Sequence, residues 1–353
     1  MRILFASGTG YLPEFSGGVQ SSTDHLIRQS LAQGHQAAVL AALFGDGMFG
    51  LKARAKLRLS GKPAVTDRIL GYDVMRSWIP WETANYAVDS FEPDVALVQC
   101  HNAVPLGRAL VDAGVPLVVY LRNVEFDELA GDPRDLRNAL FIANSRFTAE
   151  TYRAKFSIES VVIPPTIDRA QYAVETTREF VTFINPMPAK GFDLAVQIAA
   201  ACPDIPFLFV ESWSLTPADL DRITKAIGNL PNVTLQRRTS DMRSVYGRTR
   251  VLLAPSRWQE AWGRVASEAQ CSGIPVVGSN RGGLPEAIGR GGVVLDYEAP
   301  VKAWTEVVQR LCADANYYET LSSAASTHAD RDELRSDLQF EKFIAVLGAA
   351  ARL

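Results

Sequence analysis

Two glutamates eight positions apart, Glu260 and Glu268, carry the clearest chemical signal in the chain. They lie in the run PSRWQEAWGRVASEAQCSGIPVVGSNRGGLPEAIG, residues 255–289, which reads as a strand end, a loop, a helix, a strand and a glycine-rich loop. Gly263 lies between them, where a backbone without a side chain can approach a ligand closely. Unpaired N–H groups at a helix start favour a phosphate, and carboxylates accept hydrogen bonds from hydroxyls. The run therefore suits a sugar nucleotide, with the diphosphate in the middle and a sugar at each end.

The elements that must position these residues alternate along the whole chain. Apolar runs predict strands at 2–6, 37–43, 95–99, 117–120, 141–143 and 161–163, and after Pro164-Pro165 at 180–184, 207–210, 233–235, 251–254, 275–278 and 292–295. Helices fit 20–33, 81–90, 104–113 and 145–155, then 189–201, 217–230, 241–249, 264–272, 283–288, 300–314, 315–329 and 333–351. Strands that alternate with helices predict parallel sheets covered on both faces. The expected fold class is α/β, with two doubly wound Rossmann-like domains that face a cleft and bind ligands beyond the carboxyl ends of their strands.

The run at 255–289 resembles the retaining glycosyltransferases of family 4 and matches their E-x7-E motif in spacing and flanking residues. The resemblance rests on Glu260, Glu268, Pro255-Ser256, Gly263, the segment Ser272-Gly273-Ile274-Pro275-Val276-Val277 and Gly282-Gly283. It implies the GT-B fold, with an acceptor-binding domain at 1–170, a nucleotide-sugar-binding domain at 171–332, and a helix at 333–353 that packs back on the first domain. It also implies transfer of a sugar from a nucleoside diphosphate to an acceptor hydroxyl of a polysaccharide, glycolipid or secondary metabolite, with retention of configuration.

The resemblance assigns roles within the run. Glu260 would hold hydroxyls of the donor sugar, and Glu268 would hold those of the ribose. The donor site would also include Ala261, Trp262, Gly263 and Arg264, together with the amides of Gly283 and Leu284.

A further donor contact is predicted in the segment FINPMPAKGFDLA, after the first strand of the second domain. Lys190 there can place a point charge on a diphosphate. The family carries an arginine five positions earlier, where this chain has Asn185, which can still donate a neutral hydrogen bond. The candidates to replace the missing cation are Arg237, Arg238, Arg257 and Arg264.

Four residues of the first domain are further candidates. Gly17-Gly18 follow a strand and precede a helix, so their amides can approach an anion, and the resemblance places such a loop near the donor. His101 and Arg122 end strands, where a cleft residue belongs. Many family members have a histidine where Arg122 stands, so Arg122 is expected to hold a sugar hydroxyl, a phosphate or an acidic acceptor. The alternative for His101 is a bond to a backbone carbonyl. The predicted catalytic residues are Glu260, Lys190, Arg122 and His101.

Composition narrows the functional classes. A net charge of −3 argues against general nucleic-acid binding. The four cysteines form no C-x-x-C or Cys/His cluster and read as reduced core residues of a cytoplasmic protein. No D-x-D pattern occurs in a metal-site context, so neither a metal nor a cofactor is expected beside the donor. The N-terminus lacks a signal-peptide profile, and no stretch approaches the ~20 apolar residues of a transmembrane helix.

One segment differs in character from the rest. Between residues 47 and 65 the chain has five cations and no acid. The segment Lys52–Lys62 is read either as a contact for an anionic acceptor or for the inner face of a membrane, weak and peripheral, or as a solvated, mobile loop and helix. Leu51, Leu57 and Leu59 are the apolar partners of these cations, and their helical periodicity is poor.

Two other functions share this architecture. A nucleotide-sugar epimerase needs acid and base groups around the sugar but no acceptor. A non-catalytic nucleotide-sugar-binding subunit is suggested by Asn185 and Arg122, where the family's arginine and histidine are replaced. Glu260, Glu268 and Lys190, with Gly17-Gly18, argue for a catalyst instead.

Overall fold

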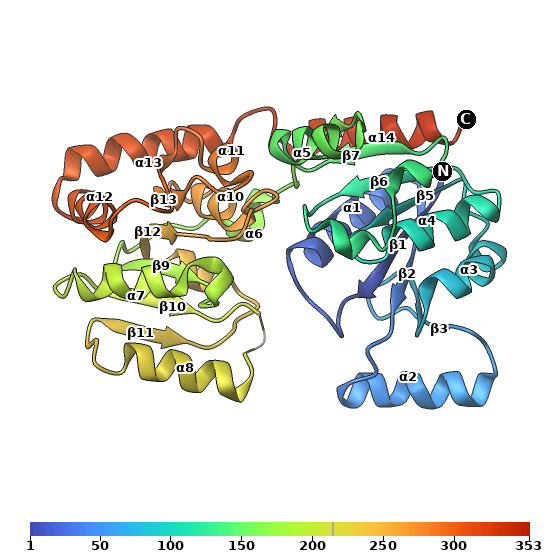
Figure 1. Cartoon of the computed structure of the whole chain (residues 1–353), viewed down its shortest axis with the longest axis horizontal. Coiled ribbons are helices and arrows are strands. Elements are labelled where there is room, and N and C mark those ends of the chain that lie inside the picture. Colours follow the sequence, from blue (N-terminus) through green and yellow to red (C-terminus); the bar gives the residue numbers. More distant parts are fainter. Residues whose placement is uncertain (214) are drawn as a thin grey trace. The chain divides into compact units, whose positions relative to one another are not determined.

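The computed structural model describes residues 1–213 and 215–353 and divides the chain into two compact units. Unit 1 consists of Met1–Thr166 and Ser336–Leu353, and unit 2 consists of Ile167–Arg335. Figure 1 shows that each unit is a sheet with helices on both faces. The α/β class predicted from the sequence is confirmed, and the predicted boundaries at 170 and 332 lie a few residues from those of the structure.

Unit 1 is built on an eight-stranded sheet with the order β3-β4-β2-β1-β5-β6-β7-β8. Neighbouring strands are parallel except for β3 and β4, which pair antiparallel. The order reverses direction between β1 and β5, which places the ends of these two strands where such sheets bind ligands. The strands are β1 Arg2–Gly10, β2 Gln36–Ala42, β3 Val65–Asp67, β4 Asp73–Ser77, β5 Val95–Gln99, β6 Leu117–Leu121, β7 Leu140–Ala143 and β8 Val161–Val162.

The helices of unit 1 close two apolar layers. Ile3 and Phe5 of β1 pack in one layer with Leu26 of α1 and Phe340 of α14, so the last helix of the chain completes the core of this unit. Leu4, which points to the other face, packs in the second layer with residues of α3, α4 and α5. The helical segments are α1 Gly18–Ala32, α2 Gly47–Ser60, η1 Pro80–Thr83, α3 Ala84–Phe91, α4 Ala103–Asp112, η2 Phe126–Leu129, η3 Pro133–Asp135, α5 Arg146–Phe156 and α14 Ser336–Ala350.

Unit 2 has a six-stranded parallel sheet with the order β11-β10-β9-β12-β13-β14. The strands are β9 Phe180–Ile184, β10 Phe207–Val210, β11 Val233–Gln236, β12 Thr249–Ala254, β13 Val276–Ser279 and β14 Gly292–Leu295. Numbered from β9, this is the order 3-2-1-4-5-6 of dinucleotide-binding folds, which reverses between β9 and β12. Ligands of such sheets bind beyond the carboxyl ends of the two strands at the reversal.

Two helical layers cover this sheet. One contains α7 Phe192–Ala200, α8 Pro217–Ile227, α12 Val301–Ala313 and α13 Ala315–Ala329, and the other α9 Arg243–Tyr246, α10 Arg264–Gln270 and α11 Leu284–Ile288. The short segments α6 Arg169–Tyr172 and η4 Pro188–Lys190 complete the unit. Within residues 1–213 and 215–353, no helix combines the length and apolar character needed to cross a membrane.

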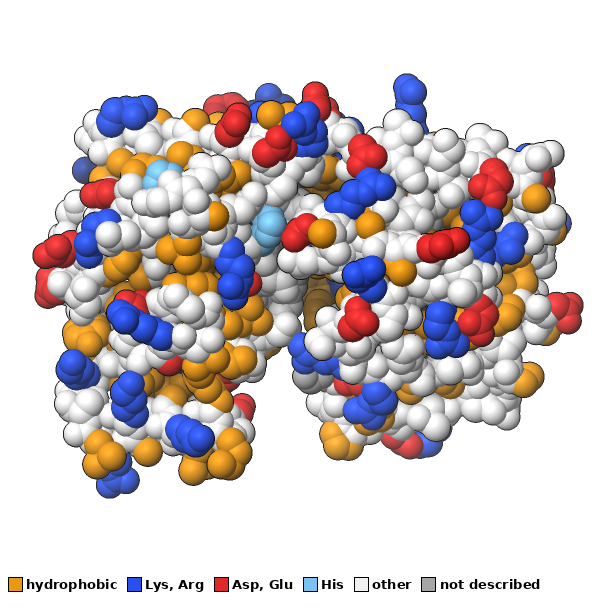
Figure 2. All heavy atoms as spheres, turned by 180° about the vertical axis from the view of Figure 1, so that it is seen from behind, with side chains coloured by type: hydrophobic (Ala, Val, Ile, Leu, Met, Phe, Trp, Pro, Cys, Tyr) orange, Lys and Arg blue, Asp and Glu red, His pale blue; other side chains and the backbone are white. Residues whose placement is uncertain are grey.

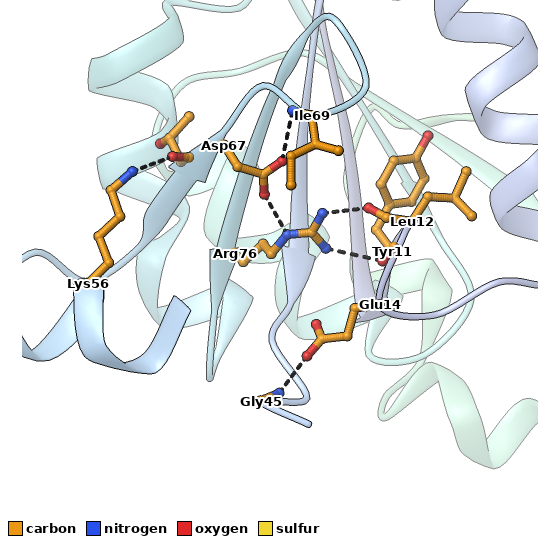
Figure 3. A network of polar contacts seen from close by, with 9 residues as sticks. Tyr11, Leu12, Glu14, Gly45, Lys56, Asp67, Ile69 and Arg76 are labelled. Atoms are coloured by element: carbon orange, nitrogen blue, oxygen red, sulfur yellow. Dashed lines mark hydrogen bonds and ion pairs between the residues drawn. The ribbon is translucent and has the colours of Figure 1, made fainter. Parts of the chain in front are cut away.

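Strands β3 and β4 were missed from the sequence because a charge interrupts their apolar pattern. Arg76 lies in β4 and is fully buried. Its Nε donates to Asp67 of β3 at 2.8 Å, and its other nitrogens donate to the carbonyl oxygens of Tyr11 and Leu12 (Figure 3). The Arg76 guanidinium also lies 4.6 Å from the centroid of the Phe49 ring in α2. A single cation thus ties two strands and a helix to the loop that leads to Gly17-Gly18.

Replacement of Arg76 by glutamine should destabilise unit 1 by about 3 kcal/mol, because Asp67 and two carbonyl groups lose a buried partner. Urea unfolding followed by circular dichroism measures the loss. Arg68→Gln is the matched control, since Arg68 pairs with Asp73 at the surface of the same strand pair and should change stability much less. Equal losses in the two variants would contradict the role of burial.

Candidate functional site

Two charged side chains meet where the strand order of unit 2 reverses. Lys190 follows β9 and Glu260 follows β12, and Lys190 Nζ donates to Glu260 Oε1 at 2.6 Å. Their side chains are only 20% and 16% exposed. Ser256 Oγ donates to the same carboxylate oxygen at 2.9 Å. The structure therefore brings together two of the residues predicted from the sequence, at the edge where an open parallel sheet binds ligands.

Close packing between backbones holds this ion pair in place. The amides of Arg257 and Trp258 donate to the carbonyl oxygen of Ala189, at 3.0 and 2.9 Å. Gly191 has a φ of +83°, and a Cβ atom there would lie 1.8 Å from the carbonyl oxygen of Pro255. Only glycine fits this position, both for its backbone conformation and for lack of space. The loops after β9 and β12 are thus locked together.

The loop after β13 also packs against Glu260. Gly283 donates its amide to the Glu260 carbonyl oxygen at 2.5 Å, and the amide of Leu284 donates to the Arg281 carbonyl oxygen at 3.2 Å. A Cβ atom on Gly282 would lie 2.2 Å from the Glu260 carbonyl oxygen. The amides of Gly283 and Leu284 were predicted to contact the donor. Such contacts would compete with these bonds inside the protein.

Glu268 lies in α10 within a buried polar cluster and is 7% exposed. Its Oε2 accepts from the Tyr246 hydroxyl at 2.9 Å, and its Oε1 accepts from Arg264 Nε at 3.2 Å. Arg264 also donates to the Tyr172 hydroxyl at 3.3 Å. Burial, and then the nearby Glu268 carboxylate, raise the pKa of Tyr246 well above its usual value, so this hydroxyl keeps its proton. A carboxylate has about four acceptor sites, so Glu268 retains capacity for further hydroxyl donors.

Arg264, Gly263 and Trp262 have structural roles in this region. Burial alone would lower the pKa of Arg264, but the Glu268 carboxylate raises the pKa of Arg264 overall. The Arg264 guanidinium is therefore charged and paired with Glu268. Gly263 precedes α10 with a φ of +97°, and a Cβ atom there would lie 2.6 Å from the Leu284 side chain. Trp262, which follows Ala261, is 4% exposed and donates its Nε1 to a serine hydroxyl of α10. Its side chain is a core residue, so a donor contact at this position would come from the main chain.

Two tryptophans beside Lys190 were not singled out from the sequence. Trp213 and Trp258 have ring centroids 6.4 Å apart in an edge-on arrangement. Lys190 Nζ lies 5.2 Å from the Trp213 centroid and 5.8 Å from that of Trp258, within the range of cation–π attraction. The side-chain oxygen of Asn185 accepts from the Trp213 amide at 3.4 Å. The position of Trp213, just after β10, was the signal that could have identified it.

Glu211 fixes the loop that contains Arg237 and Arg238. Its buried carboxylate accepts from Arg237 Nε at 2.6 Å, from the Arg238 amide at 3.2 Å and from the Leu215 amide at 3.2 Å. Burial alone would raise the pKa of this carboxyl, but these bonds hold the pKa of Glu211 below its usual value. Arg237 is thus paired with a carboxylate, and the guanidinium of Arg257 lies 5.8 Å from the centroid of the Tyr297 ring.

In unit 1, Arg122 lies against the start of α1. Its Nη1 donates to the Val19 carbonyl oxygen at 3.2 Å, next to Gly17-Gly18, and its guanidinium lies 4.0 Å from the centroid of the Tyr120 ring. Gly17 is extended, with a φ of −164°, so its backbone conformation does not require glycine. The structure therefore brings Arg122 and the predicted glycine turn together.

His101 has a carboxylate partner, in place of the backbone carbonyl considered from the sequence. Its Nδ1 lies 3.3 Å from Glu128 Oε2, and the same oxygen accepts from Asn123 Nδ2 at 2.6 Å. The imidazole is half exposed, at 49%. Glu128 was not predicted, because it lies in a short turn, η2, with no apolar periodicity.

Two family models match the chain over ranges that overlap at residues 166–171. Residues 16–171 match the model described as Glycosyltransferase Family 4, and residues 166–328 match the model described as Glycosyl transferases group 1. The chain belongs to glycosyltransferase family 4. The family named from the residues around Glu260 and Glu268 is therefore confirmed.

Curated relatives match over part of the chain. A D-inositol 3-phosphate glycosyltransferase of Segniliparus rotundus is 28% identical over an alignment of 194 residues, and the match covers 48% of this chain and 43% of the relative. Spore coat protein SA of Bacillus subtilis is 30% identical over an alignment of 168 residues, and the match covers 43% of this chain and 44% of the relative. The chain thus matches less than half the length of these relatives.

Solved structures match over nearly the whole chain. A glycosyltransferase from Rickettsia africae has a TM-score of 0.77 at 15% identity and covers 99% of this chain and 98% of its own. Anabaena HepE, solved in complex with UDP-glucose, has a TM-score of 0.78 at 20% identity and covers 99% of this chain and all of its own. At these identities the likeness establishes the fold, and the predicted GT-B class is confirmed.

The low pKa of Glu211 predicts a pH-dependent contribution to stability. Because folding favours the charged form, the contribution is complete above the unfolded pKa of about 4.5 and is lost as the pH falls through the lower folded value. Glu211→Gln should therefore melt at a lower temperature than the parent protein near neutral pH, and the difference should shrink on acidification. Glu298→Gln, at an exposed ion pair, should show little difference at any pH. A constant Glu211→Gln difference down to about pH 3 would contradict the assignment.

Proposed function

We propose that this protein transfers a sugar from a nucleoside diphosphate to an acceptor hydroxyl, with retention of anomeric configuration. The ion pair of Lys190 and Glu260, at the strand-order reversal of unit 2, is the observation that carries the proposal. It supplies an ammonium for phosphate and a carboxylate for sugar hydroxyls in one partly buried place. Family membership supports the reaction class, and the HepE structure with UDP-glucose supports a nucleotide-sugar donor.

Each acid has its own part of the donor. Glu260 binds the hydroxyls of the transferred sugar, and Glu268 binds those of the ribose. The diphosphate lies near Lys190 and the main chain at Gly263. Trp213 and Trp258 give the Lys190 side of this site two flat apolar faces, which suit the carbon skeleton of a sugar or a base.

The reaction proceeds by departure of the diphosphate and attack of the acceptor on the same face. The leaving phosphate takes the acceptor's proton, so the protein has to stabilise the negative charge that develops on that phosphate. Lys190 is suited to this because an ammonium has three donors and can bond a phosphate oxygen while it remains next to Glu260. No metal or further cofactor takes part in this scheme.

The cation that replaces the family's arginine at Asn185 comes from Arg237, Arg238, Arg257 or Arg264. Arg264 is committed to Glu268 and Arg237 to Glu211, so these two have carboxylate partners already. The backbone of Arg238 is fixed by Glu211, which sets where its side chain starts.

Unit 1 supplies the acceptor side. Gly17-Gly18 and Arg122, which lie together at the start of α1, contact the donor or an acidic acceptor. His101, oriented by Glu128, binds an acceptor hydroxyl. The enzyme acts in the cytoplasm, and the segment Lys52–Lys62 contacts an anionic acceptor or the inner face of a membrane. The acceptor is a polysaccharide, a glycolipid or a secondary metabolite.

A thermal-shift screen of UDP, GDP, ADP and dTDP with their sugars identifies the donor, because a ligand that binds only the folded state raises the melting temperature. Incubation with that donor should then give slow release of the nucleotide and, with an acceptor, a glycoside, and both should persist in EDTA. Isomerisation of the donor sugar without an acceptor would identify an epimerase. Donor binding without any turnover would identify a non-catalytic subunit.

Substitution of the two acids separates their roles. Glu260→Ala should abolish transfer, about 100-fold or more, while the affinity for the nucleoside diphosphate alone stays within about twofold of the parent. Glu268→Ala should weaken the nucleotide by about tenfold, since a hydroxyl–carboxylate bond is lost.

The buried Arg264 needs a partner, so Glu268→Gln is the companion variant that keeps the shape of the cluster. Calorimetric titration with nucleotide and measurement of the initial transfer rate provide the two readouts. Equal loss of nucleotide affinity in Glu260→Ala and Glu268→Ala would refute the division of labour.

A further inference from the structure

Helix α2 is almost wholly exposed, although it belongs to a large unit. Only Gly50 and Ala53 are buried among its fourteen residues, with Leu57 packed against the same small apolar cluster. An isolated helix of this length is marginal in water, so its attachment to the unit is narrow for its size. Half of the twelve large apolar side chains that are exposed in the described residues lie between Phe44 and Trp78, a stretch of the chain that includes α2.

The exposed apolar side chains of α2 form a stripe. Met48, Leu51 and Leu59 are 74%, 59% and 88% exposed. With Ala55 they follow steps of three, four and four residues, which places them on one face of a helix with 3.6 residues per turn. Leu57, considered from the sequence as part of this face, lies on the opposite side toward the core. Apolar residues on both faces explain why the periodicity of this segment looked poor.

Cations flank the stripe on both sides. The same helical geometry places Lys52 beside one edge and Arg54 and Arg58 beside the other, and all three are exposed. Between residues 47 and 65 there is no acid to offset them. Lys56 is excluded from this set because its Nζ donates to the Thr66 carbonyl oxygen at 2.8 Å. At the lower left of Figure 2, the surface formed by α2 shows apolar and basic side chains side by side.

Exposed aromatic rings lie in the segments next to α2. Phe44, in the loop before the helix, packs edge-on against Phe15 with ring centroids 5.4 Å apart, and both are about two-fifths exposed. Trp78, which follows β4, is 52% exposed and lies against Gly45. Aromatic rings and an apolar stripe flanked by cations are the features of helices that lie in a membrane–water interface.

We propose that α2 docks flat on an anionic lipid bilayer. Met48, Leu51 and Leu59 insert between the headgroups, and Lys52, Arg54 and Arg58 contact the phosphates. Charge complementarity selects this partner, because the segment carries only cations, and the apolar stripe selects a bilayer over a soluble polyanion. Docking needs neither donor nor transfer, so its test is independent of the proposed reaction.

Sedimentation of the full chain with vesicles tests the proposal. Vesicles of phosphatidylglycerol and phosphatidylcholine should bind the protein, and vesicles of phosphatidylcholine alone should not. The charge triple Lys52→Gln, Arg54→Gln, Arg58→Gln should lose about 100-fold in affinity, about fivefold per cation. The stripe triple Met48→Ser, Leu51→Ser, Leu59→Ser should lose at least about tenfold.

Matched controls replace exposed residues elsewhere. One control is a triple variant that removes exposed apolar side chains elsewhere: Leu31→Ser, Val161→Ser, Val294→Ser. The second control is a triple variant that makes the same change in net charge elsewhere: Lys225→Gln, Lys302→Gln, Arg310→Gln. Both should bind vesicles within about twofold of the parent, and melting curves check that every variant folds.

Three results would overturn the proposal. The parent protein could bind anionic vesicles no more tightly than neutral ones. The control triples could lose as much affinity as the α2 triples. The stripe triple could bind as tightly as the parent, in which case the face recognises a polyanion by charge alone and not a bilayer.

Discussion

The ion pair of Lys190 and Glu260 depends on how closely two backbones approach. Gly191 lies directly on the carbonyl group of Pro255, and the Ala189 carbonyl accepts two amides from the loop after β12. These contacts fix the backbone positions of Lys190 and Glu260. The two charged side chains, each less than a quarter exposed, are therefore held within hydrogen-bond distance of each other. A partly buried pair of this kind is weak evidence for stability. The pair lies where the strand order reverses, which is the place where open parallel sheets bind their ligands.

Most of the fold followed from the sequence because the parallel strands are buried on both faces and read as continuous apolar runs. Several predicted strands, such as Val95–Gln99 and Phe180–Ile184, have the bounds of the structure. Strand β4 was not predicted because Arg76 interrupts its apolar run. The carboxylate that pairs with this cation lies in the short neighbouring strand β3, and the carbonyl acceptors Tyr11 and Leu12 come from a loop more than sixty residues earlier. The buried and exposed faces of α2 could not be told apart from the sequence, because apolar residues point both toward the core and away from it.

From the sequence, candidate residues could be named where one short run contains them, as at Glu260, Gly263 and Glu268, and their roles toward a donor stay predictions. Side chains that approach these residues from other helices, strands and loops cannot be recognised from the sequence of that run. Tyr246 approaches Glu268 from α9, and Trp213 approaches Lys190 from the loop after β10. The internal bonds made by the amide groups of Gly283 and Leu284 are likewise visible only once the loops are packed together. Sequence spacing thus indicates which groups are present, and tertiary contacts decide which of them are already engaged.

The position of α14 has a consequence for how the protein folds during its synthesis. This helix contributes Phe340, Phe343 and Leu347 to the layer that covers β1, yet the ribosome makes it after all of unit 2. Domains generally fold as units during synthesis, with the N-terminal one first. Here the unit that is synthesised first is completed last. Its apolar face over β1 stays uncovered until translation has passed residue 347, and this face is a surface that chaperones can bind during synthesis.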